Sequence, residues 1–292
     1  MENFADRLLS AIVKADRSPV CVGLDPDFAR LPEALKSAAP VAAIERFCLG
    51  VIEAVAGIVP AVKPQVAYFE RYGALGVSAY EKVVAAARKA GLIVIGDVKR
   101  NDIGSTAQQY AEGHLGRDDS ADAITVNGYL GADGINPFID VAARTGRGLF
   151  VLVRTSNPSA ALVQDFADAK GKRFYQHLAE HLAGIGGRSG LVGRNGYSCV
   201  GAVVGATYPQ EAFLLRDLMP QQIFLVPGYG VQGASAADCA AAFKRDGTGA
   251  IVNASRSVLY AFSQQRYAGR PWQAAVAEEA KAFAADMKQA LQ

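Results

Sequence analysis

The stretch LIVIGDVKRNDIGS at residues 92–105 begins as an apolar run and ends in a cluster of charges. Its first residues are apolar and rich in isoleucine and valine, which predicts a buried strand. Asp97, Lys99, Arg100 and Asp102 then follow within six residues. Burying a charge without a partner costs several kcal/mol. The stretch therefore predicts a core strand whose carboxyl end carries charges that need partners.

Runs of the same kind recur along the chain, with helix-like segments between them. They lie at residues 20–25, 61–69, 92–99, 123–129, 148–156, 199–207, 223–230 and 249–256. Eight strands that alternate with helices indicate a parallel sheet. The strand count and the length of 292 residues favour a closed (β/α)8 TIM barrel over an open doubly wound sheet. We expect one barrel domain over residues 1–292, with an inserted excursion at about 157–198.

Nearly every predicted strand ends in polar or glycine residues, and a barrel brings such ends to one face. Lys63 ends the second strand, next to the third. Asp97 and Lys99 are two residues apart, so a strand points both side chains to the same face. Asp102 in the following loop completes a row of alternating sign. This row indicates a catalytic site, and a structural salt-bridge network is the alternative.

A glycine motif follows the seventh predicted strand. Gly228, Gly230 and Gly233 in VPGYGVQG spell G-x-G-x-x-G. A dinucleotide site needs this motif in a first βαβ unit with an acidic residue about 20 residues later, and this chain has neither. Barrels often bind phosphate between the loops after strands seven and eight. With Arg256 just after the eighth strand as a bidentate donor, the glycines predict a phosphate site.

Composition excludes several classes of protein. Hydrophobic residues make up 51% of the chain and the net charge is +2, which indicates a globular protein without a nucleic-acid surface. No apolar run is long enough to span a membrane, and the N-terminus lacks the features of a signal peptide. The four cysteines are widely separated, which favours buried thiols in a reduced, cytoplasmic protein. His177 and His181 in HLAEH favour a solvated helix face over a metal site.

The segment DVKRNDIGST resembles the D-x-K-x-x-D-I signature of orotidine 5′-phosphate decarboxylases, in the form of the longer bacterial type. The likeness runs along the whole barrel, because further motifs match in order from Asp25 and Lys63 to Ser156, Gln232 and Arg256. The resemblance implies decarboxylation of orotidine 5′-monophosphate to uridine 5′-monophosphate (UMP) and CO2 in pyrimidine synthesis. It also implies that no cofactor or metal takes part.

The resemblance implies roles for the charged residues. Asp25 and Lys63 would hold the ribose, and Asp97 would lie against the substrate carboxylate. Lys99 would donate the proton to C6 of the ring. Asp102 would reach into the site of the neighbouring subunit, which implies a homodimer.

The resemblance also implies a set of binding residues. Ser156 would hydrogen-bond the pyrimidine amide, and Gln232 would bridge the base and the phosphate. Two further groups complete the expected site. Ile103 and Thr106 would lie beside Asp102, and the phosphate would be held by Gly228, Tyr229, Gly230 and Arg256.

Three other functions fit parts of the pattern. Hexulose-phosphate synthases and ketogulonate-phosphate decarboxylases resemble it too, but they use Mg2+ held in part by a Glu where this chain has Lys63, and an ammonium cannot coordinate a cation. A Schiff-base aldolase using Lys63 or Lys99 would need a lysine that readily loses its proton, and neighbouring carboxylates favour the charged form of a lysine instead. A non-catalytic sugar-phosphate-binding barrel is the third, although a binder gains little from alternating charges.

Overall fold

The eight expected strands form a closed parallel barrel in a computed structural model that describes residues 1–16, 18–230 and 233–292. The strands are β1 Val20–Leu24, β2 Ala61–Pro64, β3 Ile93–Arg100, β4 Ala123–Asn127, β5 Gly148–Arg154, β6 Ser198–Val204, β7 Gln222–Pro227 and β8 Ala250–Ala254. Each strand pairs with the next, and β8 returns to β1 with Val252 beside Val20. The TIM barrel is confirmed and the open sheet is excluded.

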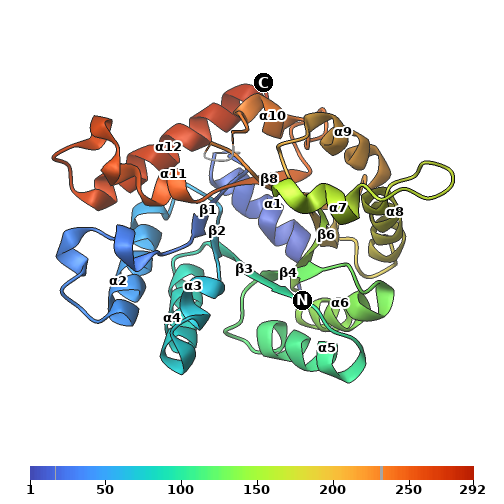
Figure 1. The fold of residues 1–292 in the computed structure, drawn as a ribbon, viewed down its shortest axis with the longest axis horizontal. Coiled ribbons are helices and arrows are strands. Elements are labelled where there is room, and N and C mark those ends of the chain that lie inside the picture. Colours follow the sequence, from blue (N-terminus) through green and yellow to red (C-terminus); the bar gives the residue numbers. More distant parts are fainter. Residues whose placement is uncertain (17, 231–232) are drawn as a thin grey trace.

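Helices surround the barrel (Figure 1). The α-helices are α1 Phe4–Lys14, α2 Pro40–Val55, α3 Ala67–Glu70, α4 Gly73–Lys89, α5 Gly104–Ala111, α6 Ala132–Thr145, α7 Ala161–Gln164, α8 Phe174–Gly186, α9 Pro209–Leu218, α10 Ala236–Ala240, α11 Arg256–Leu259 and α12 Trp272–Ala290. Short turns of other helix types are η1 Phe28–Arg30, η2 Glu33–Leu35, η3 Glu112–Gly116, η4 Pro158–Ala160, η5 Ala261–Ser263 and η6 Gln265–Tyr267.

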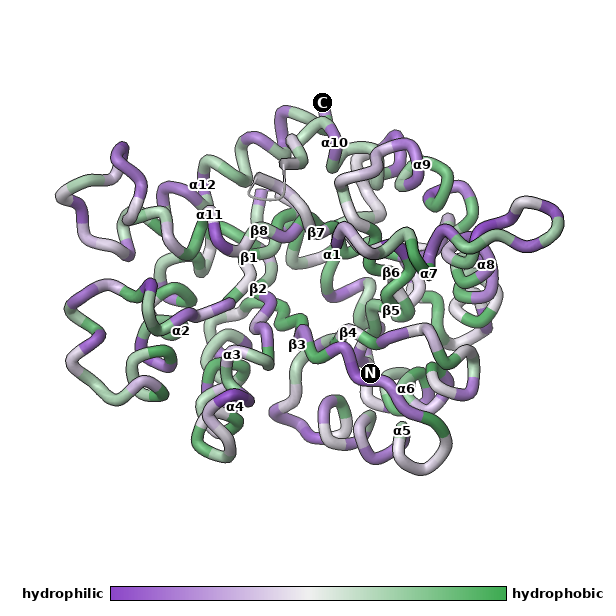
Figure 2. The backbone as a smooth tube through the Cα atoms, viewed as in Figure 1, coloured by the Kyte–Doolittle hydropathy of each residue, from purple (hydrophilic) through white to green (hydrophobic). Residues whose placement is uncertain are grey.

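Helix α1 closes the end of the barrel where the strands begin. Phe4 is fully buried, and its ring meets the ring of Phe150 edge to face at 5.8 Å. A Cβ at Gly148 would lie 2.1 Å from the Phe4 ring, so only glycine permits this packing. The strands themselves are apolar along β5, β6 and β7 (Figure 2). With one end filled, the polar strand ends at the other end are left to form a site.

Strand β2 is shorter than the sequence predicts. The apolar run at 61–69 contains a strand that ends at Pro64 and a helical turn, α3, that begins at Ala67. Proline has no amide hydrogen to extend a strand ladder. Phe69 is fully buried from the helix rather than from a strand, and hydrophobicity alone does not distinguish the two.

The segment at 157–198 has two parts. Its second part contains α8, which packs against β5 and β6 as the ordinary connecting helix of a barrel. Its first part, with η4, α7 and a loop that reaches outward in Figure 1, is the addition to the barrel. We keep the name excursion for residues 157–173, which lie at the carboxyl end of β5. Within the described part of the chain, no helix has the length and apolar character needed to cross a membrane.

Candidate active site

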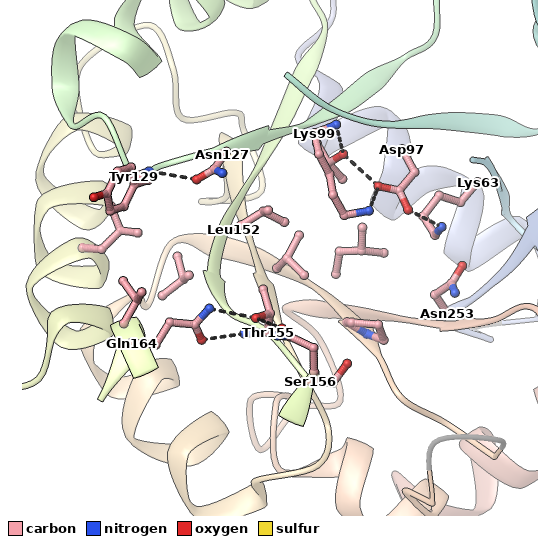
Figure 3. A pocket seen from close by; sticks show the side chains of 18 of the residues that line it. Lys63, Asp97, Lys99, Asn127, Tyr129, Leu152, Thr155, Ser156, Gln164 and Asn253 are labelled. Carbon is pink, nitrogen blue, oxygen red and sulfur yellow. Dashed lines mark hydrogen bonds and ion pairs between the residues drawn. The ribbon is translucent and has the colours of Figure 1, made fainter. Parts of the chain in front are cut away.

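Three charged side chains form a row at the carboxyl ends of β2 and β3 (Figure 3). The Lys63 ammonium donates to Asp97 Oδ2 at 2.7 Å, and the Lys99 ammonium donates to Asp97 Oδ1 at 2.5 Å. Lys63 and Asp97 are each only 8% exposed in their side chains, whereas Lys99 is 47% exposed. Asp97 and Lys99 thus have ion-pair partners, and Lys99 has the most accessible side chain of the three.

Two neutral side chains complete the hydrogen bonds of Asp97. The hydroxyl of Thr125 donates to Oδ1 at 2.9 Å, and the amide of Gln65 donates to Oδ2 at 2.9 Å. Sequence reasoning missed both residues. The available signal was Thr125 as a polar residue within an apolar strand, and Gln65 two positions after Lys63. With four donors, the Asp97 carboxylate is fixed in one orientation.

The backbone at Lys99 departs from a regular strand. Its φ is +46°, in the left-handed region that side chains other than glycine rarely adopt, and the register between β3 and β4 shifts between Gly96 and Arg100. The Lys99 amide donates to Thr125 Oγ1 at 2.9 Å, which holds this conformation. Strained backbone of this kind concentrates at functional sites. One residue before β3 ends, this conformation accompanies a Lys99 side chain that contacts Asp97.

The row is ionised in the folded protein. Burial alone would raise the pKa of Asp97, but the charges of Lys63 and Lys99 and their hydrogen bonds hold it below its ordinary value of 3.8. Burial would likewise lower the pKa of Lys63, but Asp97 and Asp25 more than offset this and raise it above 10.5. A lowered carboxyl pKa contributes stability that is present above pH 3.8 and is lost as pH falls through the folded value. The ion pair therefore persists at neutral and mildly acidic pH.

The remaining charges of the opening stretch lie outside this row. Arg100 contacts Glu70, and its Nε donates to His114 at 3.1 Å. Asp102 Oδ1 accepts the amide hydrogen of Ile103 at 2.8 Å, and Ile103 is 52% exposed. Thr106 is also exposed, on α5. A single subunit therefore has a row of three charges, Lys63, Asp97 and Lys99. Within the described site, the chain's own Asp102 does not join this row as the sequence predicts.

A cavity of about 570 Å³ opens above the row, within the range of small-molecule sites. It is lined on one side by Asp25, Lys63, Asp97 and Lys99. On the other side its lining includes Asn127, Tyr129, Thr155, Ser156, Gln164, Phe174 and Leu178. Figure 3 shows Ser156 across the cavity from the charge row. The excursion contributes Gln164, which sequence reasoning did not identify.

A second cavity of about 330 Å³ continues from the first toward the ends of β7 and β8. Both cavities are lined by Asp25, Asn253 and Ser255, and the second also by Gly228, Tyr229 and Arg256. Asp25 Oδ1 and Asn253 Oδ1 are buried without a hydrogen-bond partner among the described residues. Two such acceptors facing a shared space suit a ligand with hydroxyl groups.

The glycine loop differs from the expected one in detail. The amide of Gly230 donates to the Ala234 carbonyl at 2.9 Å, and that of Gly233 donates to the Gly230 carbonyl at 2.8 Å. These two amides stabilise the loop itself and do not point to a ligand. The hydroxyl of Tyr229, which lines the same cavity as Arg256, donates to Asp286 at 2.6 Å and is therefore already engaged within the protein. Gln232 lies outside the described residues.

The histidines of HLAEH lie on α8. His177 Nε2 is 2.9 Å from Asp168 Oδ2 at the surface. In the described ranges, no group of three or more His, Cys, Asp or Glu side chains is placed to hold a metal ion.

Comparison with known proteins adds independent information. The sequence matches the Orotidine 5′-phosphate decarboxylase / HUMPS family over residues 18–270. The orotidine 5′-phosphate decarboxylase of Rhodopirellula baltica is 44% identical over 280 residues, which covers 91% of each chain. A crystal structure from Streptomyces avermitilis is 38% identical with a TM-score of 0.83 and covers 100% of this chain and 96% of its own.

The structure of Leishmania donovani OMP decarboxylase is 33% identical with a TM-score of 0.75, covering 97% of this chain and 99% of that one. The family match extends over all eight strands of the barrel. The chain belongs to the orotidine 5′-phosphate decarboxylase / HUMPS family.

Proposed function

We propose that this protein decarboxylates orotidine 5′-monophosphate to UMP and CO2 without a metal or other cofactor. The observation that carries the proposal is the row Lys63–Asp97–Lys99, with the Lys99 ammonium at the cavity. The curated relatives named for this activity support it, with 44% identity in the case of the Rhodopirellula baltica enzyme. The family also includes other enzymes, so the choice within it depends on the residues of the row.

The proposed reaction develops negative charge at one carbon, C6 of the pyrimidine ring, and the enzyme must stabilise it. The bond from C6 to the carboxylate breaks, CO2 leaves, and the electron pair remains on C6 in the plane of the ring. No neighbouring carbonyl delocalises this pair, so the barrier is high and the enzyme must supply large stabilisation. The Lys99 ammonium lies at the cavity, stabilises the developing negative charge and then gives its proton to C6. Lys99 regains a proton from solvent before the next turnover, so the reaction consumes one proton and needs no added oxidant or reductant.

Asp97 orients the proton donor in this proposal. Its carboxylate is held by four hydrogen bonds and remains ionised, so it keeps the Lys99 ammonium charged and directed into the cavity. A fixed ion pair of this kind needs no reorganisation during the reaction. Lys63 neutralises the other side of Asp97. The substrate carboxylate would lie near Asp97, on the side of the row that Lys99 faces.

The nucleotide would extend across both cavities. The buried acceptors Asp25 Oδ1 and Asn253 Oδ1 suit the ribose hydroxyls, and the cavity beside Arg256 suits the phosphate. Ser156 would face the pyrimidine amide from the opposite wall of the main cavity. Energy from binding the remote phosphate would then help to stabilise the transition state.

Replacing Arg256 with alanine is expected to weaken UMP binding by about 10- to 100-fold, because a charged hydrogen-bond donor to the phosphate is lost. Uridine, which has no phosphate, should bind the variant and the unchanged protein equally. Calorimetric titration with both ligands measures this difference. Arg270→Ala is a matched control, since Arg270 is an exposed arginine paired with Glu278. Equal losses for UMP and uridine would show that Arg256 does not hold the phosphate.

We further propose that the active unit is a homodimer in which Asp102 completes the partner's charge row. In one chain Asp102 is half-buried in the loop before α5, with exposed Ile103 and Thr106 beside it. An aspartate from the partner would give the exposed side of Lys99 a second carboxylate. The proposed dimer would thus form the four-charge row that the sequence predicts, with the fourth charge supplied by the partner subunit.

A mixing experiment tests this sharing. Lys99→Ala and Asp102→Ala dimers should each be inactive, and subunit exchange between equal amounts should restore about a quarter of the unchanged activity, since half the dimers are hybrids with one intact site each. The measurement is the decarboxylation rate before and after exchange. If the mixture stays inactive although hybrids are detected by native mass spectrometry, Asp102 acts within its own subunit; an Asp102→Ala dimer that is itself active would show that Asp102 is not needed.

The metal-dependent sugar-phosphate enzymes are the alternative within the resemblance. Lys63 argues against them, because its buried ammonium would repel a divalent cation at the end of β2. The proposed reaction is tested by adding orotidine 5′-monophosphate to the protein, following the ultraviolet change from orotate to uracil, and measuring released CO2. Formation of UMP and CO2 in equal amounts is expected, and absence of both would contradict the proposal.

A further inference from the structure

Arg154, the last residue of β5, is a buried charge that the proposed chemistry does not use. Its side chain is 2% exposed. Its Nε and Nη2 donate to the two carboxylate oxygens of Glu211 at 2.6 and 3.2 Å, and its Nη1 lies 2.9 Å from Asp165 Oδ1. The guanidinium also lies near the rings of Tyr175 and Tyr208, at 5.0 and 4.9 Å from their centroids. Burying an arginine requires this complete pairing.

The partners of Arg154 come from three separate elements. Asp165 follows α7 in the excursion, Tyr175 belongs to α8, and Glu211 belongs to α9. Bidentate pairing with a carboxylate fixes both distance and direction. One side chain therefore joins the excursion to the barrel helices beneath the carboxyl end of β5.

A second set of contacts leads from this cluster into the main cavity. Gln164, next to Asp165, accepts the amide hydrogen of Thr155 at 3.0 Å and donates to the Thr155 hydroxyl at 2.8 Å. Arg154 Nη1 also donates to Gln164 Oε1 at 3.4 Å. Figure 3 shows Gln164 directed at Thr155, immediately before Ser156. Both hydrogen-bonding groups of Thr155 are thereby held by the excursion.

We propose that Arg154 is a positioning residue for the pyrimidine end of the site: by holding Asp165 and Glu211 together it keeps Gln164 on Thr155 and so fixes Ser156 toward the cavity. This inference rests on the proposed function, because Ser156 is taken as the contact to the pyrimidine. It gives the excursion a role, which is to set the wall opposite the charge row.

A purely structural arginine in the same protein shows the contrast. Arg216 is buried and donates to the carbonyl oxygens of Met219, Gln222, Ala242 and Gly249. Among the described residues that line the main cavity, none is one of these four. Arg154, in contrast, is bonded to Gln164, which does line it.

The test is a double-mutant cycle read by ligand binding. Arg154→Lys keeps the charge but loses the bidentate pairing, and we expect it to weaken UMP binding about tenfold. Binding of ribose 5-phosphate, which has no base, should change less than about twofold. In a Ser156→Ala background, Arg154→Lys should cost less than about twofold in UMP affinity, because its effect passes through Ser156. A purely structural role would weaken both ligands and would persist in that background.

Two further variants keep the test decisive. Gln164→Leu removes the hydrogen bonds to Thr155 and the 3.4 Å contact with Arg154, but it keeps the pairing of Arg154 with Glu211 and Asp165. It should repeat the ligand pattern even if Arg154→Lys does not fold. Arg173→Met is the matched control, because Arg173 lies 3.4 and 3.7 Å from the same carboxylates but is 45% exposed. It should leave both affinities within about twofold.

The outcomes separate two failures. If the unchanged protein binds ribose 5-phosphate but not UMP, the proposed function is wrong and the inference is wrong with it. If the unchanged protein binds UMP, and the Gln164→Leu variant binds both ligands as tightly as the unchanged protein, only the role given to Arg154 and Gln164 is wrong.

Discussion

Replacing Lys99 with alanine is expected to lower turnover of orotidine 5′-monophosphate by about 10⁴-fold or more, because in the proposed mechanism one side chain supplies both proton donation and charge stabilisation. UMP binding should change by less than about tenfold, since the ribose and phosphate contacts remain. A single-turnover rate and a calorimetric titration give the two numbers. Lys99 is the accessible end of the row, so the proposal predicts that its loss leaves C6 without a proton donor.

A control lysine shows whether the effect is local. Lys82 on α4 is exposed and pairs with Glu45, and Lys82→Ala should keep full turnover and full UMP affinity. Near-full activity of the Lys99→Ala variant would show that Lys99 is not the proton donor. A large loss of UMP binding in Lys99→Ala would instead assign Lys99 mainly to ground-state binding.

Replacing Asp97 with asparagine is expected to lower the free energy of unfolding by about 3–5 kcal/mol, because the change leaves the buried ammonium of Lys63 without its closest counter-charge. Turnover should also fall by about 10³-fold, since Lys99 loses the carboxylate that orients it. Lys63 and Asp97 are each 8% exposed, so solvent does little to screen the loss. Chemical denaturation at pH 7 and the decarboxylation rate measure the two effects.

Asp119 provides the matched control for stability. It pairs with Arg117 at 3.0 Å, as Asp97 pairs with its lysines, but its side chain is 61% exposed. Asp119→Asn should therefore cost less than about 1 kcal/mol. A loss for Asp97→Asn no larger than for Asp119→Asn would mean that Lys63 finds another partner and that the row is not a tightly coupled unit.

The charge row itself was predictable from strand ends. Lys63, Asp97 and Lys99 stand at carboxyl ends of neighbouring strands, and alternation placed two of them on one face. The positive φ at Lys99 and the shift of register were not predictable, because they depend on Thr125 from the next strand. Side-chain bonds between residues distant in sequence leave no periodic signal.

The loops were harder to predict than the strands. The motif of Gly228, Gly230 and Gly233 predicts a phosphate site, and Gly228 and Gly230 flank a loop whose amides at Gly230 and Gly233 bond within the loop. The phosphate site beside Arg256 stays a prediction. The excursion was visible only as a long connection, and the pairing of Arg154 with Asp165 and Glu211 joins residues up to 57 positions apart. Asp102 points to another subunit only through the resemblance, since a single chain gives it no partner in the row.

One assay decides whether the charge row works without a metal. The initial rate of conversion of orotidine 5′-monophosphate to UMP is measured in excess EDTA and again with added Mg2+. We expect equal rates, because the buried Lys63 ammonium would repel a divalent cation and, in the proposed mechanism, the Lys99 ammonium supplies the positive charge. Loss of turnover in EDTA that Mg2+ restores would contradict the metal-free mechanism and the role given to Lys63.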